Sequence, residues 1–217
     1  MGAIYSAVAF FQKGGLFMYP ILLVFAVGMA IAVERWLHLG RIRSENRKAW
    51  EEVHPVLAEG EFDRARELVN EDQSTISQML SMGLARQGAV RRRADSEIAM
   101  EESMMEIIPQ LEKRTPYLAL LSNIATLLGL LGTIMGLIQA FTAVANANPA
   151  EKADLLSASI SVAMNTTAFG LIVAIPLMLI HARLTSTTGE IVDSLEMASV
   201  KALNSISNSS KRQYQTS

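Results

Sequence analysis

The sequence predicts an all-α membrane protein with three transmembrane helices and long helical cytoplasmic extensions. Half of the 217 residues are hydrophobic, and the mean hydropathy of the chain is positive. The charged residues are crowded, because 29 of the 40 Asp, Glu, Lys and Arg residues fall between Glu34 and Pro116. Three nearly uncharged tracts remain, and each can supply the roughly 20 residues that a helix needs to cross a bilayer core.

The N-terminal tract predicts an interfacial segment followed by one retained span. Residues 1–15 carry aromatic side chains and suit a periplasmic segment at the membrane interface, with an irregular start as the alternative. Residues 16–34 form transmembrane helix 1, where Pro20 lies near the start and removes a donor that would be unpaired anyway. No basic leader with a small-residue cleavage site is present, so we expect this span to remain uncleaved.

Basic residues after the first span set its orientation. They arrive within fourteen residues and are Arg35, Arg41, Arg43, Arg47 and Lys48. Because cytoplasmic flanks are enriched in Lys and Arg, this end is expected in the cytoplasm and the N-terminus outside.

Residues 35–116 are expected to form a cytoplasmic helical domain. Apolar residues recur there at helical spacing, and no strand-like alternation competes. We expect Pro55 and Gly60 to interrupt the first of these helices. A glutamate-rich helix then leads through Pro109 and Pro116 into the second span as one long, kinked helix.

The remaining tracts complete the topology. Residues 117–145 form transmembrane helix 2, residues 146–156 a periplasmic loop, and residues 157–182 transmembrane helix 3. The third span returns to the cytoplasm at Arg183, and residues 183–217 form a cytoplasmic C-terminal helix and tail.

Small residues mark one stripe on each of the last two spans. The stripe of the second span contains Gly129, Gly132, Thr133, Gly136 and Ala140. The stripe of the third contains Ser159, Ala163, Thr167, Gly170 and Ala174. Small residues at three- and four-residue intervals let helices approach closely. The two stripes are therefore expected to pack, with Thr133 and Thr167 near the contact. Pro176 of the third span is also expected among the helix-packing residues.

Polar side chains inside these spans point to transport. Thr133, Thr167, Asn165 and Thr166 are the candidate ion-pathway residues, because a bilayer core offers no water to satisfy their polar groups. The alternative is that each hydroxyl bonds a carbonyl three or four residues back and has no further role. No Asp, Glu, Lys or Arg lies between Arg114 and Glu151 or between Asp154 and Arg183. A carboxylate that carries an ion must then come from a second polypeptide.

Two segments resemble the signature helices of the MotA/TolQ/ExbB proton channel family. They are Gly-Leu-Leu-Gly-Thr-Ile-Met-Gly at 129–136 and Ala-Met-Asn-Thr-Thr-Ala-Phe-Gly-Leu-Ile-Val-Ala-Ile-Pro at 163–176, which ends with Pro176. The resemblance covers nearly the whole chain, and its three spans are closest to the ExbB/TolQ group. In ExbB itself a glutamate lies five residues before the third-span threonine, whereas this chain has Val162.

The resemblance implies a stator subunit in the bacterial inner membrane. It implies a five-membered ring of this chain around a dimer of a one-span ExbD/TolR-like partner, whose membrane aspartate carries a proton. Thr133 and Thr167 match the family's channel-lining threonines. A TonB/TolA-like transducer would draw on the proton motive force for a process such as TonB-dependent import. The transported ion is expected to be H⁺, with Na⁺ as the alternative.

Other classes of function fit the sequence less well. An oligomeric scaffold without ion conduction remains the structural alternative. The chain has no cysteine and no His-Glu-x-x-His or Gly-x-Ser-x-Gly motif, so we expect no enzyme, no metal site and no cofactor. The basic residues are expected to orient the chain and contact phospholipids, and no nucleic-acid partner is expected.

Overall fold

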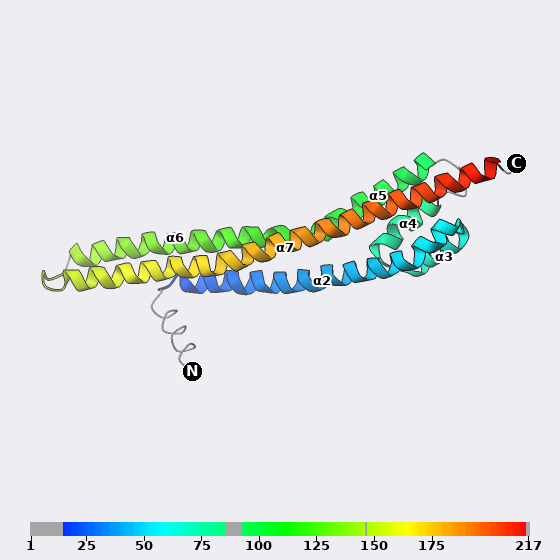
Figure 1. Ribbon diagram of the computed structural model, residues 1–217. Coiled ribbons are helices and arrows are strands. Elements are labelled where there is room, and N and C mark those ends of the chain that lie inside the picture. Colours follow the sequence, from blue (N-terminus) through cyan, green and yellow to red (C-terminus); the bar gives the residue numbers. More distant parts are fainter. Residues whose placement is uncertain (1–14, 86–92, 146, 216–217) are drawn as a thin grey trace, which may run out of the picture. The chain divides into compact units, whose positions relative to one another are not determined.

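The computed structural model describes residues 15–85, 93–145 and 147–215, with side chains described as far as residue 208. Throughout these residues the secondary structure is helical (Figure 1). The helices are α2 (Met18–Glu59), α3 (Phe62–Glu71), α4 (Thr75–Ala85), α5 (Arg93–Glu112), α6 (Thr115–Ala145) and α7 (Lys152–Gln215). The predicted all-α class is confirmed, while the predicted N-terminal segment lies outside the described residues except at Gly15.

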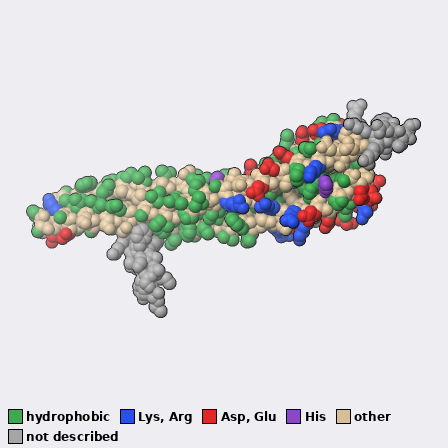
Figure 2. Space-filling model, in the orientation of Figure 1, with side chains coloured by type: hydrophobic (Ala, Val, Ile, Leu, Met, Phe, Trp, Pro, Cys, Tyr) green, Lys and Arg blue, Asp and Glu red, His purple; other side chains and the backbone are tan. Residues whose placement is uncertain are grey.

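The chain divides into two compact units. The apolar unit joins Met1–Glu34 with Arg114–Arg183, and the charged unit joins Arg35–Lys113 with Leu184–Ser217. Figure 2 shows hydrophobic side chains over the visible face of the apolar unit, with charged side chains gathered over the charged unit. Three helical stretches within the described residues are long and apolar enough to cross a membrane, namely α2, the stretch Arg93–Ala145 that ends with α6, and α7. The chain is thus a multi-pass membrane protein with three candidate spans.

Helix α2 is longer than the sequence predicts. It contains Pro20 in its first turn, where proline is tolerated, and it continues through Pro55 to Glu59. The expected interruption at Pro55 is therefore wrong, because the helix runs for four residues beyond it. The expected interruption at Gly60 is confirmed, since this residue has φ 86° and closes the helix in a left-handed conformation that glycine adopts without strain.

The chain also breaks where one continuous kinked helix was expected. Helix α5 ends at Glu112, α6 begins at Thr115, and between them Arg114 has φ 68°. Pro116 cannot donate a hydrogen bond to the carbonyl of Glu112, so the helical ladder is interrupted there. The guanidinium of the buried Arg35 donates to the carbonyl of Leu111 near the end of α5. In this way a side chain of α2 satisfies one terminal carbonyl of α5.

The charged unit is built around α4. This helix packs against α3 and α5 and buries an apolar face that includes Met79, Leu80 and Leu84. The predicted amphipathic continuation of the third span is confirmed, because α7 reaches Gln215 without interruption. The residues of α7 that this pattern places inside are buried, and they are Ile191, Leu195, Ala198, Ala202 and Ile206.

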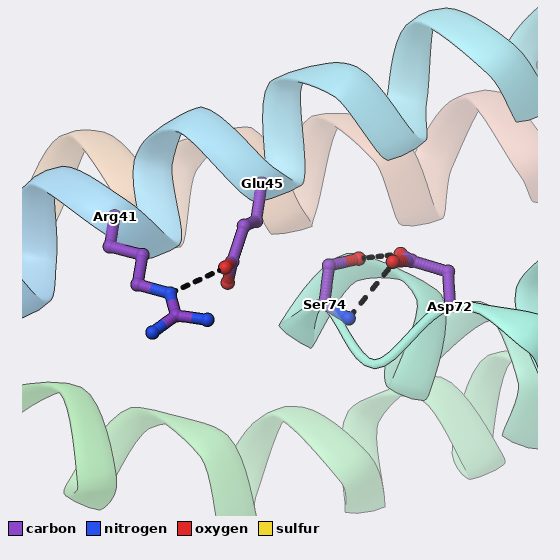
Figure 3. A network of polar contacts seen from close by, with 4 residues as sticks. All are labelled: Arg41, Glu45, Asp72 and Ser74. Carbon is purple, nitrogen blue, oxygen red and sulfur yellow. Dashed lines mark hydrogen bonds and ion pairs between the residues drawn. The ribbon is translucent and has the colours of Figure 1, made fainter.

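Polar caps fix the N-terminus of α4. The Asp72 carboxylate accepts hydrogen bonds from the backbone and hydroxyl of Ser74 (Figure 3). It also accepts one from the hydroxyl of Ser77 at 2.7 Å. The buried Asn46 of α2 adds a second cap, since its Oδ1 accepts from the Thr75 hydroxyl at 2.9 Å and the Ile76 amide at 3.2 Å. These acceptors satisfy donors that a helix N-terminus otherwise leaves unpaired.

Candidate functional site between α6 and α7

Glycines bring α6 and α7 into close contact inside the apolar unit. A Cβ atom added at Gly170 of α7 would lie 2.7 Å from the carbonyl oxygen of Ala125 and 3.0 Å from the Cα of Gly129. These neighbours are backbone atoms and cannot turn aside as a flexible side chain could. The two helix backbones therefore meet here at a distance that only glycine allows.

The contact continues toward the C-terminal end of α6. A Cβ atom added at Gly136 would lie 2.8 Å from that of Ala163, and one at Gly132 would overlap the methyl group of Thr166. The predicted packing of the two small-residue stripes is present along this seam. Pro176, named with the packing residues, is exposed on α7.

The hydroxyls of Thr133 and Thr167 meet across the seam. Their oxygens are in hydrogen-bonding contact, and both side chains are half-buried. Each hydroxyl also lies within hydrogen-bonding distance of the Gly129 carbonyl, at 3.2 Å for Thr133 and 2.9 Å for Thr167. The two hydroxyls have one hydrogen each, and there are three oxygen–oxygen contacts. At any moment, therefore, at least one of the three contacts is not a hydrogen bond. The donors can exchange by rotating the hydroxyls, without any movement of the helices.

The neighbouring residues of α7 lie on other faces of this helix than Thr167. Successive helical residues are about 100° apart, so Asn165 lies about 200° from Thr167 around the helix. Thr166 is buried, and its hydroxyl donates to the Val162 carbonyl at 2.9 Å on its own helix. The structure brings Thr133 and Thr167 together, whereas a role of Asn165 or Thr166 in an ion pathway stays a prediction.

Ser122 is a polar contact of the seam that the sequence reasoning missed. Its hydroxyl is buried and donates to the Ala174 carbonyl of α7 at 2.8 Å. The sequence could have predicted this contact, because Ser122 lies seven residues before Gly129 and therefore on nearly the same face of α6. Ser122 extends the hydrogen-bonded part of the seam toward the N-terminal end of α6.

The electrostatics of this site are set by neutral groups. In the described part of the chain, no three His, Cys, Asp or Glu residues gather as a metal site would need. An ion pair between Arg114 and Glu34, at 3.5 Å, lies at the start of α6. From there, α6 has no charged residue before its end at Ala145. The site can offer hydroxyl and carbonyl oxygens to a passing group, but its own side chains have no proton to titrate near neutral pH.

Comparison with known proteins adds an independent line of evidence. The model of the MotA/TolQ/ExbB proton channel family matches residues 71–197, which is more than half of the chain. This matched region contains α4, α5 and α6 and reaches into α7, so it includes both sides of the seam.

Individual relatives agree with the family match. The chain is 29% identical over 189 residues to a biopolymer transport protein of Methanothermobacter thermautotrophicus that is described as an ExbB homologue. The match covers 86% of this chain and 66% of that relative. It is 27% identical to an ExbB-like protein of Synechocystis, covering 84% of this chain and 72% of the relative. A segment of 86 residues, 40% of this chain, is 36% identical to the Tol-Pal system protein TolQ of Haemophilus influenzae and covers 37% of it. The chain thus spans just under two thirds of the Methanothermobacter relative's length.

Proposed function

The chain belongs to the MotA/TolQ/ExbB proton channel family, and from this premise we propose that it is the channel subunit of an ion-driven motor in the bacterial inner membrane. The observation that carries the proposal is the contact between the Thr133 and Thr167 hydroxyls, on two spans that contain no carboxylate. Such a pair can guide a charged group that another chain brings, but it cannot carry a proton itself.

In the proposed mechanism, Thr133 and Thr167 line the route of a partner's carboxyl group. A protonated carboxyl is neutral and can pass the seam, where it exchanges hydrogen bonds with the two hydroxyls. A deprotonated carboxylate accepts hydrogen bonds from the same hydroxyls, which rotate to donate. One elementary charge moved through 100 mV supplies about 2.3 kcal/mol, so several ions per cycle can drive mechanical work.

The proposed assembly follows the family. Five copies of this chain surround a dimer of a one-span ExbD/TolR-like partner that supplies the membrane aspartate. The N-terminus is periplasmic and the C-terminus cytoplasmic, which agrees with the basic residues after the first span. A TonB/TolA-like transducer then passes the work to an envelope process such as TonB-dependent import. Protons are the proposed ion, and a sodium-driven motor is the alternative.

The test of this proposal is ion flux through the assembled complex. Thr133→Val and Thr167→Val keep the branched shape of the side chain and remove its hydroxyl. Loss of one hydrogen bond of about 1 kcal/mol slows a step roughly fivefold, so flux should fall by at least that factor in each variant while assembly is retained. Proton uptake into vesicles that contain the complex, under an imposed membrane potential, measures this.

A matched control is available on α6. Thr142 is exposed, and its hydroxyl bonds the Ile138 carbonyl at 2.8 Å on its own helix. It lies nine residues after Thr133, which places it about 180° around the helix. Thr142→Val should therefore conduct normally. Normal flux in Thr133→Val and Thr167→Val would instead remove this pair from the pathway and favour the scaffold alternative.

A further inference from the structure

Two exposed polar side chains of α6 lie deep within the second span. Asn123 and Thr126 are nine and twelve residues beyond Arg114, so at a helical rise of 1.5 Å they lie about 14 and 18 Å into the span. Both are exposed on the single chain. The next charged residue along the chain is Glu151, so this depth is within the apolar tract.

Asn123 is an exposed amide at a depth where contact with hydrocarbon would be unfavourable. The Thr126 hydroxyl bonds the Ser122 carbonyl at 3.2 Å, so its hydrogen is satisfied by its own helix. The Asn123 amide makes no side-chain hydrogen bond to any other residue that the structure describes. An amide with two donors and one acceptor is unstable against lipid tails. Asn123 must therefore face water or a polar surface.

Both residues share a face of α6 with Thr133. At about 100° per residue, Asn123, Thr126 and Thr133 fall within a sector of about 80°. This sector flanks the seam with α7, which Thr133 reaches directly. The polar face thus runs from the threonine pair toward the N-terminal end of α6, which is the cytoplasmic end in the proposed topology.

The other spans provide no polar side chain at this depth. On α7, every residue between Thr167 and His181 is apolar or glycine. On α2, the same holds between Tyr19 and Glu34. The exposed residues of α7 beyond the threonine pair are large and hydrophobic, and they include Leu171, Ile172 and Ile175. Between Tyr117 and the threonine pair, Asn123 and Thr126 are therefore the polar side chains exposed on α6.

We infer that Asn123 and Thr126 line the cytoplasmic half of the ion pathway, as residues that hold water. This inference rests on the proposed function. Neither side chain titrates near neutral pH, so a proton that leaves the partner's carboxyl at the threonine pair moves on through water hydrogen-bonded to the Asn123 amide. No bond to this chain forms or breaks, and the proton passes from the carboxyl to water and then to the cytoplasm.

Water access can be measured directly because the chain contains no cysteine. Asn123→Cys and Thr126→Cys are introduced singly into the complete complex in its membrane, and a water-soluble maleimide is applied. A maleimide reacts with thiolate, which forms in water and is suppressed in lipid. Both variants should be labelled, at least roughly tenfold faster than Met135→Cys.

Met135 is the matched control for labelling. It is 37% exposed on the same helix and lies nine residues after Thr126, which places it about half a turn away. Labelling of neither Asn123→Cys nor Thr126→Cys would overturn the inference. Thr126→Cys replaces a hydroxyl that is satisfied within its own helix by a thiol and removes one exposed methyl group, so it decides the question even if changes at Asn123 disturb assembly.

Flux separates this inference from the proposal on which it rests. Asn123→Leu should lower proton flux by about fivefold or more, and Asn123→Ser should restore part of it. Gln139→Leu should leave flux unchanged, because Gln139 is an exposed amide on α6 about 160° from Asn123. If Thr133→Val blocks flux and Asn123→Leu does not, the inference fails and the proposed function stands. If Thr133→Val conducts normally, the proposed function itself fails.

Discussion

At the scale of single residues, Gly170 sets how closely α6 and α7 can approach. We expect Gly170→Ala to destabilise the protein by about 1–3 kcal/mol, because the added methyl group meets backbone atoms of Ala125 and Gly129. The measurement is thermal or denaturant unfolding in detergent, followed by helix content. Loss of the seam should also separate the Thr133 and Thr167 hydroxyls, so flux should fall together with stability.

Gly189 provides the opposite case on the same helix. It lies in the part of α7 that belongs to the charged unit, and a Cβ added there meets nothing within 4 Å. Alanine favours a helix interior over glycine by about 1 kcal/mol, so Gly189→Ala should leave the protein as stable or more stable. Equal destabilisation by both variants would show that the packing at Gly170 is not what limits stability.

At the scale of elements, the N-terminal cap of α4 predicts a dependence on pH. Partial burial raises the pKa of the Asp72 carboxyl, but the hydrogen bonds from Ser74 and Ser77 outweigh it and hold the pKa below the ordinary value of 3.8. The charged form is therefore favoured by folding, and its contribution is complete above that ordinary value. It is lost as the pH falls through the lowered pKa of the folded state, which means in acid below about pH 4.

A substitution isolates this cap. Asp72→Ala should lower the free energy of unfolding by about 1 kcal/mol at neutral pH, and the difference from the unsubstituted chain should shrink in acid. Asp63→Ala is the control, since Asp63 is 98% exposed and pairs only with Arg66 at 3.2 Å among the described residues. Urea unfolding from about pH 3 to about pH 7 measures the free energy of unfolding of each variant relative to the unsubstituted chain, over a range that begins below the ordinary carboxyl pKa. A loss at Asp72 that does not change with pH would contradict this account of the cap.

The elements also show how far the sequence could predict the structure. The apolar tracts were sufficient to predict three candidate spans, because length and hydropathy define them. Small-residue spacing was sufficient to predict the contact of Thr133 with Thr167, because helical periodicity places each on the stripe that packs. The effect of each proline on the helix boundaries was harder to predict. Pro55 lies inside α2, whereas Pro116 follows a break, and periodicity does not distinguish them. What differs is the surrounding structure, where the left-handed Arg114 ends one ladder before the next begins. Periodicity also places Asn165 about 200° around α7 from Thr167, so a part for Asn165 in the ion pathway stays a prediction.

At the scale of the whole molecule, a single copy is incomplete as a conducting unit. The apolar unit exposes large hydrophobic residues on α2, α6 and α7, as lipid or neighbouring copies require. It also exposes the Asn123 amide, which lipid cannot satisfy, and its second and third spans contain no carboxylate to carry an ion. A ring of copies around an acidic partner would supply both a polar environment for Asn123 and a carboxylate to carry the ion. The polar face of α6 would then contact water and the partner instead of lipid tails.

The assembly predicted from this argument can be weighed directly. Native mass spectrometry of the complex, gently extracted from its own membrane, should find five copies of this chain with two copies of a one-span protein that bears a membrane aspartate. The measured masses distinguish a motor complex from a scaffold, because each stoichiometry gives a different total mass. Thr133→Val should give the same stoichiometry, since that substitution removes a hydroxyl from a seam within one copy and is expected to affect conduction alone. A ring without any acidic partner would leave the ion without a carrier, and the chain would then act as a scaffold.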